Sequence, residues 1–118
     1  MIADDETIMF KPRTVYLSIA AWPVLAIWRN RLTPEVTVMQ DQIEFRMLRR
    51  HRFAMADITG IDVDLGLGNR VVVSRRGSRW AYVASFPQLE GAYAMIDLLR
   101  RRGVPLNASA RQLMERFA

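Results

Sequence analysis

The sequence predicts an α+β domain: a bent antiparallel barrel, or two packed sheets, closed by a C-terminal amphipathic helix. Between residues 14 and 85, short apolar runs recur between turn signals at intervals of roughly eight to twelve residues, which is typical of an antiparallel meander. After residue 85 the apolar spacing changes to steps of three and four, which predicts one helix with a single apolar face. The apolar positions of this helix are Leu89, Ala92, Tyr93, Ile96 and Leu99.

The uncharged run Val15–Trp28 opens the domain and is predicted to form two buried strands rather than a membrane-spanning helix. A spanning helix needs about 20 apolar residues, and Pro23 would kink a helix within this shorter run. Acidic residues precede the run and no convincing cleavage site follows it, so a signal peptide fits poorly. Trp22 and Trp28 leave open a membrane or partner contact, because tryptophan favours the membrane boundary. The two strands would be Thr14–Ala20 and Val24–Arg29.

Further strands are expected in the middle of the chain. Apolar and polar residues alternate in Gln42–Leu48, so Glu44 and its polar neighbours should face solvent. Arg75–Ser78 has the chemistry of a hairpin turn, and Trp80 and Tyr82 after it are expected in the core. The remaining apolar runs are Glu35–Met39, Phe53–Ala56, Ile58–Leu65 and Val71–Ser74.

The closing helix is predicted over residues 87–102, with Ser85 as its N-cap and Gln88 completing a capping box. Gly103 can supply a left-handed C-cap. A second short helix should begin at Asn107 or Ser109 and either pack on the domain or fray. We therefore divide the chain into an N-terminal leader (1–13), one domain (14–104) and a short C-terminal helix (105–118).

The composition excludes several kinds of chemistry. The chain has no cysteine, which rules out disulfides, thiol catalysis and cysteine-ligated metal sites. Its one histidine, His51, rules out a multi-histidine metal site and is expected at the surface. We find no nucleophile–base pair, metal cluster or cofactor loop, so we expect no enzymatic activity and no cofactor.

The net charge of +5 is concentrated in the middle and the C-terminal part of the chain. Residues 49–86 hold seven basic and three acidic side chains, a balance of +4. Two basic turns are expected there, one at Arg49–Arg52 and one formed by Arg75, Arg76 and Arg79, and either could bind a phosphate or an anionic headgroup. The competing interpretation is that these charges keep the turns soluble and protect sheet edges. Nucleic acid is a less favoured partner, because no RNA-binding motif accompanies the aromatic residues.

The order of strands followed by one helix resembles the small bacterial pleckstrin-homology-like (PH-like) domains. In these domains a hairpin leads to an I-x-x-I-x-V strand, here Ile58–Val63, then to another hairpin and a closing helix. The resemblance covers about residues 33–103 and implies binding or scaffolding rather than catalysis. Many eukaryotic PH domains bind phosphoinositides near the opening hairpin, but Ala21–Pro23 stand there in this sequence, so that site does not transfer.

Together these observations predict a non-enzymatic PH-like binding module, either cytoplasmic or peripheral at the inner face of a membrane. Its partner would be a protein or an anionic membrane, contacted through Arg49, Arg50, Arg52, Arg75, Arg76 and Arg79, with Trp22 and Trp28 as further contacts. The alternative is a structural subunit that self-associates into a homo-oligomer through its apolar N-terminal segment or its sheet edges.

Overall fold

The computed structural model describes residues 7–19, 22–30, 34–46, 50–65 and 68–116, and of residues 18–19 and 22–30 it describes the backbone alone. The strands are β1 (Ile8–Phe10), β2 (Thr14–Ile19), β3 (Trp22–Asn30), β4 (Glu35–Val38), β5 (Gln42–Arg46), β6 (Arg50–Ala54), β7 (Ile58–Asp64), β8 (Asn69–Arg75) and β9 (Trp80–Phe86). The helices are the 3-10 turn η1 (Met55–Asp57), α1 (Leu89–Arg101) and α2 (Ala108–Arg116).

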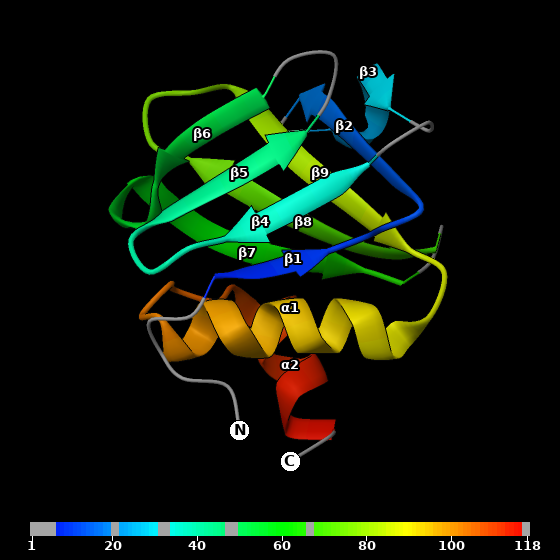
Figure 1. Ribbon diagram of the computed structural model, residues 1–118. Coiled ribbons are helices and arrows are strands. Elements are labelled where there is room, and N and C mark those ends of the chain that lie inside the picture. The colour runs from blue at the N-terminus through cyan, green and yellow to red at the C-terminus, as the bar shows by residue number, and fades with distance from the viewer. Residues whose placement is uncertain (1–6, 20–21, 31–33, 47–49, 66–67, 117–118) are drawn as a thin grey trace.

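These strands form two antiparallel sheets that pack face to face (Figure 1). Sheet 1 has the strand order β1-β4-β5-β6, and sheet 2 has the order β3-β2-β9-β8-β7. Within the described residues no strand ladder closes the two sheets into a barrel. The α+β prediction is therefore confirmed, and of its two forms the structure takes the packed sheets.

The opening hairpin contributes to both sheets. Its first arm, β1 and β2, bends at Lys11–Arg13, where Pro12 has no backbone N–H to continue a ladder. Consequently β1 pairs with β4 in sheet 1, whereas β2 pairs with β3 in sheet 2. The two strands predicted for Val15–Trp28 are present, and the expected leader contains strand β1. The side chains of Trp22 and Trp28 lie outside the described part of the molecule.

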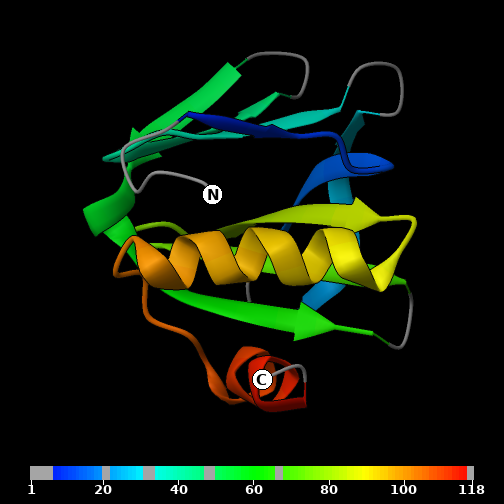
Figure 2. The same ribbon diagram turned by 60° about the horizontal axis from the view of Figure 1, so that its bottom comes forward.

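The core lies between the sheets and is sealed by α1, which runs across their open end (Figure 2). Both sheets are apolar on their inner faces because alternate residues of each strand point the same way. The apolar face of α1 completes this enclosure, as its spacing predicts. The largest fully buried side chains come from both sheets and both helices: Phe45, Ile43, Ile61, Met95, Ile96, Leu98, Leu99 and Leu113.

The predicted start of α1 is wrong. Ser85 lies in β9, where it pairs with Thr14 of β2 and Arg70 of β8. Strand β9 continues through Phe86, so the helix begins too far along the chain for Ser85 to cap it. Gln88 is the N-cap instead, and its side chain makes no capping hydrogen bond.

The C-terminal part packs on the domain rather than fraying. Gly103 ends α1 with a positive φ of 87°, and the Val104 amide donates to the Leu99 carbonyl at 3.1 Å, as expected for a left-handed cap. Ala110 and Leu113 then bury one face of α2 in the main core. No helix within the described ranges is long and apolar enough to cross a membrane.

We predict that Gly91→Ala destabilises the protein, although alanine normally favours a helix over glycine. A Cβ at this position would lie 2.8 Å from Cδ1 of Phe86, whose ring is buried and meets Phe10 edge to face. Overpacking of this kind costs about 1–3 kcal/mol, to be measured by urea denaturation. If the cause is this contact, Phe86→Leu should remove most of the penalty; an equal penalty in both backgrounds would contradict the explanation.

Candidate binding surface

The described arginines of the predicted site lie on β6 and at the β8–β9 turn, at the end of the molecule away from α1 and α2 (Figure 1). Arg49 falls outside the described residues. Arg50 and Arg52 were expected in a turn, but they belong to β6. They pair with Arg46 and Glu44 of β5, so the ladder holds this segment extended.

Glu44 is buried beneath these two arginines. The Arg50 guanidinium donates to Oε1 of Glu44 at 3.1 Å, and the Arg52 guanidinium donates to Oε2 at 3.1 Å. Burial alone would raise the pKa of Glu44, but the hydrogen bonds and charges of Arg52 and Arg50 outweigh it and hold the pKa below its usual value. The expectation that Glu44 faces solvent is therefore wrong, because its cross-strand neighbours cover it.

The ion pairs offset much of the positive charge on this face of sheet 1. Besides the Glu44 network, Arg46 pairs with Glu35 at 3.5 Å. Three arginines and two glutamates leave a balance of +1. Arg50 and Arg52 keep 57% and 56% of their side-chain surface exposed, so they can still contact a partner from their outer sides.

Arg70 of β8 is basic but buried, so it is not available to contact a partner. Its side chain is 7% exposed, and it donates hydrogen bonds to the Tyr16 hydroxyl, at 2.8 Å, and to the Asp64 carboxylate. Its charge is compensated inside the protein, as buried charges require.

Among the described arginines of the predicted site, those of the β8–β9 turn have the least compensated charge. Its predicted geometry is confirmed: the Ser78 amide donates to the Arg75 carbonyl at 3.2 Å, and Gly77 takes a positive φ of 74°. Arg76 and Arg79 are exposed. Within the described ranges, no carboxylate forms an ion pair with either of them.

Aromatic packing fixes the base of this turn. The Arg75 guanidinium lies 4.9 Å from the centre of the Phe53 ring, and the Phe53 ring lies 5.0 Å from that of Tyr82. The Tyr82 hydroxyl is 3.5 Å from Nδ1 of His51. His51 was expected at the surface, but it is half-buried because its strand places it against Tyr82.

Trp80 was expected in the core with Tyr82, but the two residues differ. Tyr82 is buried, whereas Trp80 keeps 37% of its surface exposed. Trp80 is the first residue of β9, beside the turn and opposite Ile19 at the end of β2. Its place next to Arg79 at the edge of a turn was the signal in the sequence that it would reach solvent. We call Arg75, Arg76, Arg79 and Trp80 the basic hairpin end.

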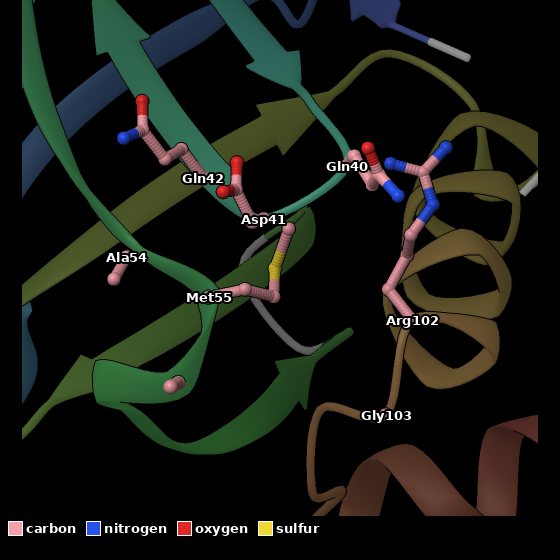
Figure 3. Close-up of a pocket in the computed structure, with 8 residues that line it drawn as sticks. Gln40, Asp41, Gln42, Ala54, Met55, Arg102 and Gly103 are labelled. Atoms are coloured by element: carbon pink, nitrogen blue, oxygen red, sulfur yellow. The ribbon is translucent and has the colours of Figure 1, made fainter. Parts of the chain in front are cut away.

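A cavity of about 500 Å³ lies elsewhere, between the β4–β5 turn, η1 and the end of α1 (Figure 3). The Arg102 side chain lies beside Gln40 on one wall, and Asp41 and Met55 stand across from them. Arg102 also donates to the Met39 carbonyl, which ties α1 to the β4–β5 turn. With one guanidinium and one carboxylate in its lining, this cavity shows no preference for an anion over a cation.

Comparison with known proteins supports the PH-like fold. The sequence matches no family model and no curated protein. Among solved structures it is similar to a chain of the Spt16D Pob3N heterodimer, with a TM-score of 0.61 and 12% sequence identity. The match covers 86% of this chain and 53% of that chain, so the present chain spans about half its length. At this identity the likeness shows the fold alone: two antiparallel sheets with a C-terminal helix, as in PH-like domains.

Proposed function

We propose that this chain is a non-enzymatic binding module that docks its basic hairpin end on an anionic membrane surface. The observation that carries the proposal is the β8–β9 turn, where exposed Arg76 and Arg79 stand next to the partly exposed ring of Trp80. Arginine attracts anionic headgroups, and tryptophan favours the membrane boundary. A protruding turn suits a flat surface, and the basic hairpin end lies apart from the cavity lined by Gln40, Met55 and Arg102.

The expected affinity is modest. A basic residue near an anionic leaflet contributes about 1 kcal/mol, so two arginines give weak, reversible binding that one partly exposed tryptophan strengthens. The cytoplasmic leaflet carries the anionic lipids, which supports the inner face of a membrane as the location. On the evidence of the sequence, we also propose that the chain is one of the small bacterial PH-like domains. We propose further membrane contacts, again from the sequence, through Arg49, Arg50, Arg52, Trp22 and Trp28.

A protein with an acidic surface is the second candidate partner. The solved structure that this chain resembles is a heterodimer, which supports a protein–protein role for a domain of this shape. The same arginines would contact either an anionic membrane or an acidic protein. Binding to vesicles that contain no protein distinguishes the two candidate partners.

We predict that the protein floats with vesicles containing phosphatidylserine but not with neutral vesicles, and that high salt abolishes flotation, because exposed charges are screened within about 8 Å at physiological ionic strength. Arg76→Gln/Arg79→Gln should weaken binding about 30-fold, from two contacts of about 1 kcal/mol each. Trp80→Ala should reduce the part of the binding that survives moderate salt.

The matched control is Arg111→Gln/Arg116→Gln, which removes the same charge from exposed positions on α2 at the other end of the molecule (Figure 1). This control should bind nearly as well as the wild-type protein. Equal losses in the two variants would show that net charge alone drives binding. The absence of flotation at low salt would reject the membrane and leave the acidic protein partner.

We also predict that Glu44→Gln increases binding to anionic vesicles in the same flotation measurement, because it frees the charges of Arg50 and Arg52.

The same substitution should change how the stability of the protein depends on pH. The pKa of Glu44 is lowered in the folded protein. The stabilisation of the folded state by Glu44 is therefore complete above the pKa of an unfolded glutamate and is lost as the pH falls through the lower, folded pKa. The variant should therefore lose about 1 kcal/mol at pH 7 and less at an acidic pH at which the wild-type carboxylate is partly protonated. Urea denaturation at both pH values tests this, with Glu35→Gln as a weaker comparison; a loss that did not depend on pH would contradict it.

A further inference from the structure

The β8–β9 turn holds a serine among the arginines of the basic hairpin end. Ser78 comes shortly after Arg75 and Arg76 and directly before Arg79. Its Oγ accepts a hydrogen bond from the Trp80 amide at 3.0 Å, a contact at the surface of the protein. The hydroxyl therefore belongs to the end of the molecule that we propose faces the membrane.

The other serines with described side chains lie in regular structure or hold it together. Ser74 and Ser85 are paired in the β8–β9 ladder. The Ser109 hydroxyl donates to the Asp62 carboxylate and so ties α2 to β7. Ser78 instead lies beyond the last pair of the β8–β9 ladder, so an enzyme can reach its hydroxyl without separating two strands.

We propose that Ser78 is a phosphorylation site, and that its phosphate releases the basic hairpin end from the membrane. The inference rests on the proposed function and adds a regulation of the same site. Protein kinases select their substrates partly by charge pattern. A serine in an exposed turn, with arginines on both sides, suits a serine kinase whose substrate groove is acidic.

The modification is an ordinary phosphoryl transfer. A bond forms between Oγ of Ser78 and the γ-phosphorus of a nucleoside triphosphate, and the bond from that phosphorus to the β–γ bridging oxygen breaks. The nucleoside diphosphate leaves, and the hydroxyl proton passes to the aspartate of the kinase's catalytic loop.

The phosphate would cancel the charge on which membrane binding depends. A phosphoserine carries about −1.5 to −2 charges at pH 7, which offsets the two positive charges of Arg76 and Arg79. No described carboxylate forms an ion pair with either arginine, so both can donate charge-assisted hydrogen bonds to the phosphate. Phosphorylation should therefore weaken binding to anionic vesicles about 30-fold, as much as removing both arginines.

The test treats the protein and its Ser78→Ala variant with an arginine-directed serine kinase and magnesium ATP. Mass spectrometry should show one phosphate on the wild-type protein that the variant does not acquire. Flotation with vesicles containing phosphatidylserine is then measured before and after treatment. The wild-type protein should bind about 30-fold more weakly after treatment, whereas the binding of Ser78→Ala should not change.

A charged substitution tests the second half of the proposal without a kinase. Ser78→Asp should bind on the order of fivefold more weakly than its uncharged counterpart Ser78→Asn, because one carboxylate offsets one arginine. The matched control is Gln112→Glu, which adds the same charge at an exposed position of α2, at the other end of the molecule (Figure 1). This control should bind nearly as well as the wild-type protein.

Each other outcome overturns the proposal. No phosphate on the wild-type protein, or an equal amount on Ser78→Ala, would show that Ser78 is not the site. Flotation that survives phosphorylation would show that the phosphate does not control binding, and would leave the proposed function intact. Equal losses in Ser78→Asp and Gln112→Glu would reduce the effect to net charge. The absence of flotation by the unmodified protein at low salt would instead reject membrane binding, and the switch with it.

Discussion

Tyr82 is the residue on which the packing of the two sheets centres. Only the opening hairpin contributes strands to both sheets, and η1 connects β6 of sheet 1 to β7 of sheet 2. Between these connections the described sheets are held together by side chains. The Tyr82 ring, on sheet 2, stacks on Phe45 of sheet 1 at 5.1 Å and contacts Phe53 at 5.0 Å. Aromatic pairs of this kind contribute beyond the area they bury. Helix α1 then seals the remaining open end of the core.

This packing also decides which arginines are available to a partner. Phe53, held by Tyr82, supports the Arg75 guanidinium. Arg52, next to Phe53 on β6, and Arg50 both pair with the buried carboxylate of Glu44. Arg50, Arg52, Arg75 and Arg76 therefore have different roles, and of these four the charge of Arg76, in the turn, is the least compensated by described residues.

Features that depend on the local spacing of residues could be predicted from the sequence. Features that depend on pairing between strands distant in the sequence could not. The alternation around Ile43 and the turn chemistry around Gly77 act over a few residues, so the strands and the hairpin could be predicted. Ser85 has the local signature of a helix cap, but its ladders with β2 and β8 override it. Glu44 is buried by arginines six and eight positions along the chain, and only the β5–β6 register shows that these side chains meet.

The position of each arginine in the sheets indicates whether its charge protects a sheet edge or is available to bind a partner. Arg50 and Arg52 stand on an edge strand, where exposed charge prevents pairing with other chains, so their presence is explained without a ligand. Arg76 and Arg79 lie beyond the last β8–β9 pair, Ser74 with Ala81, where there is no ladder to protect. Arg76, Arg79 and the partly exposed Trp80 are therefore the residues on which the proposed binding to an anionic partner depends.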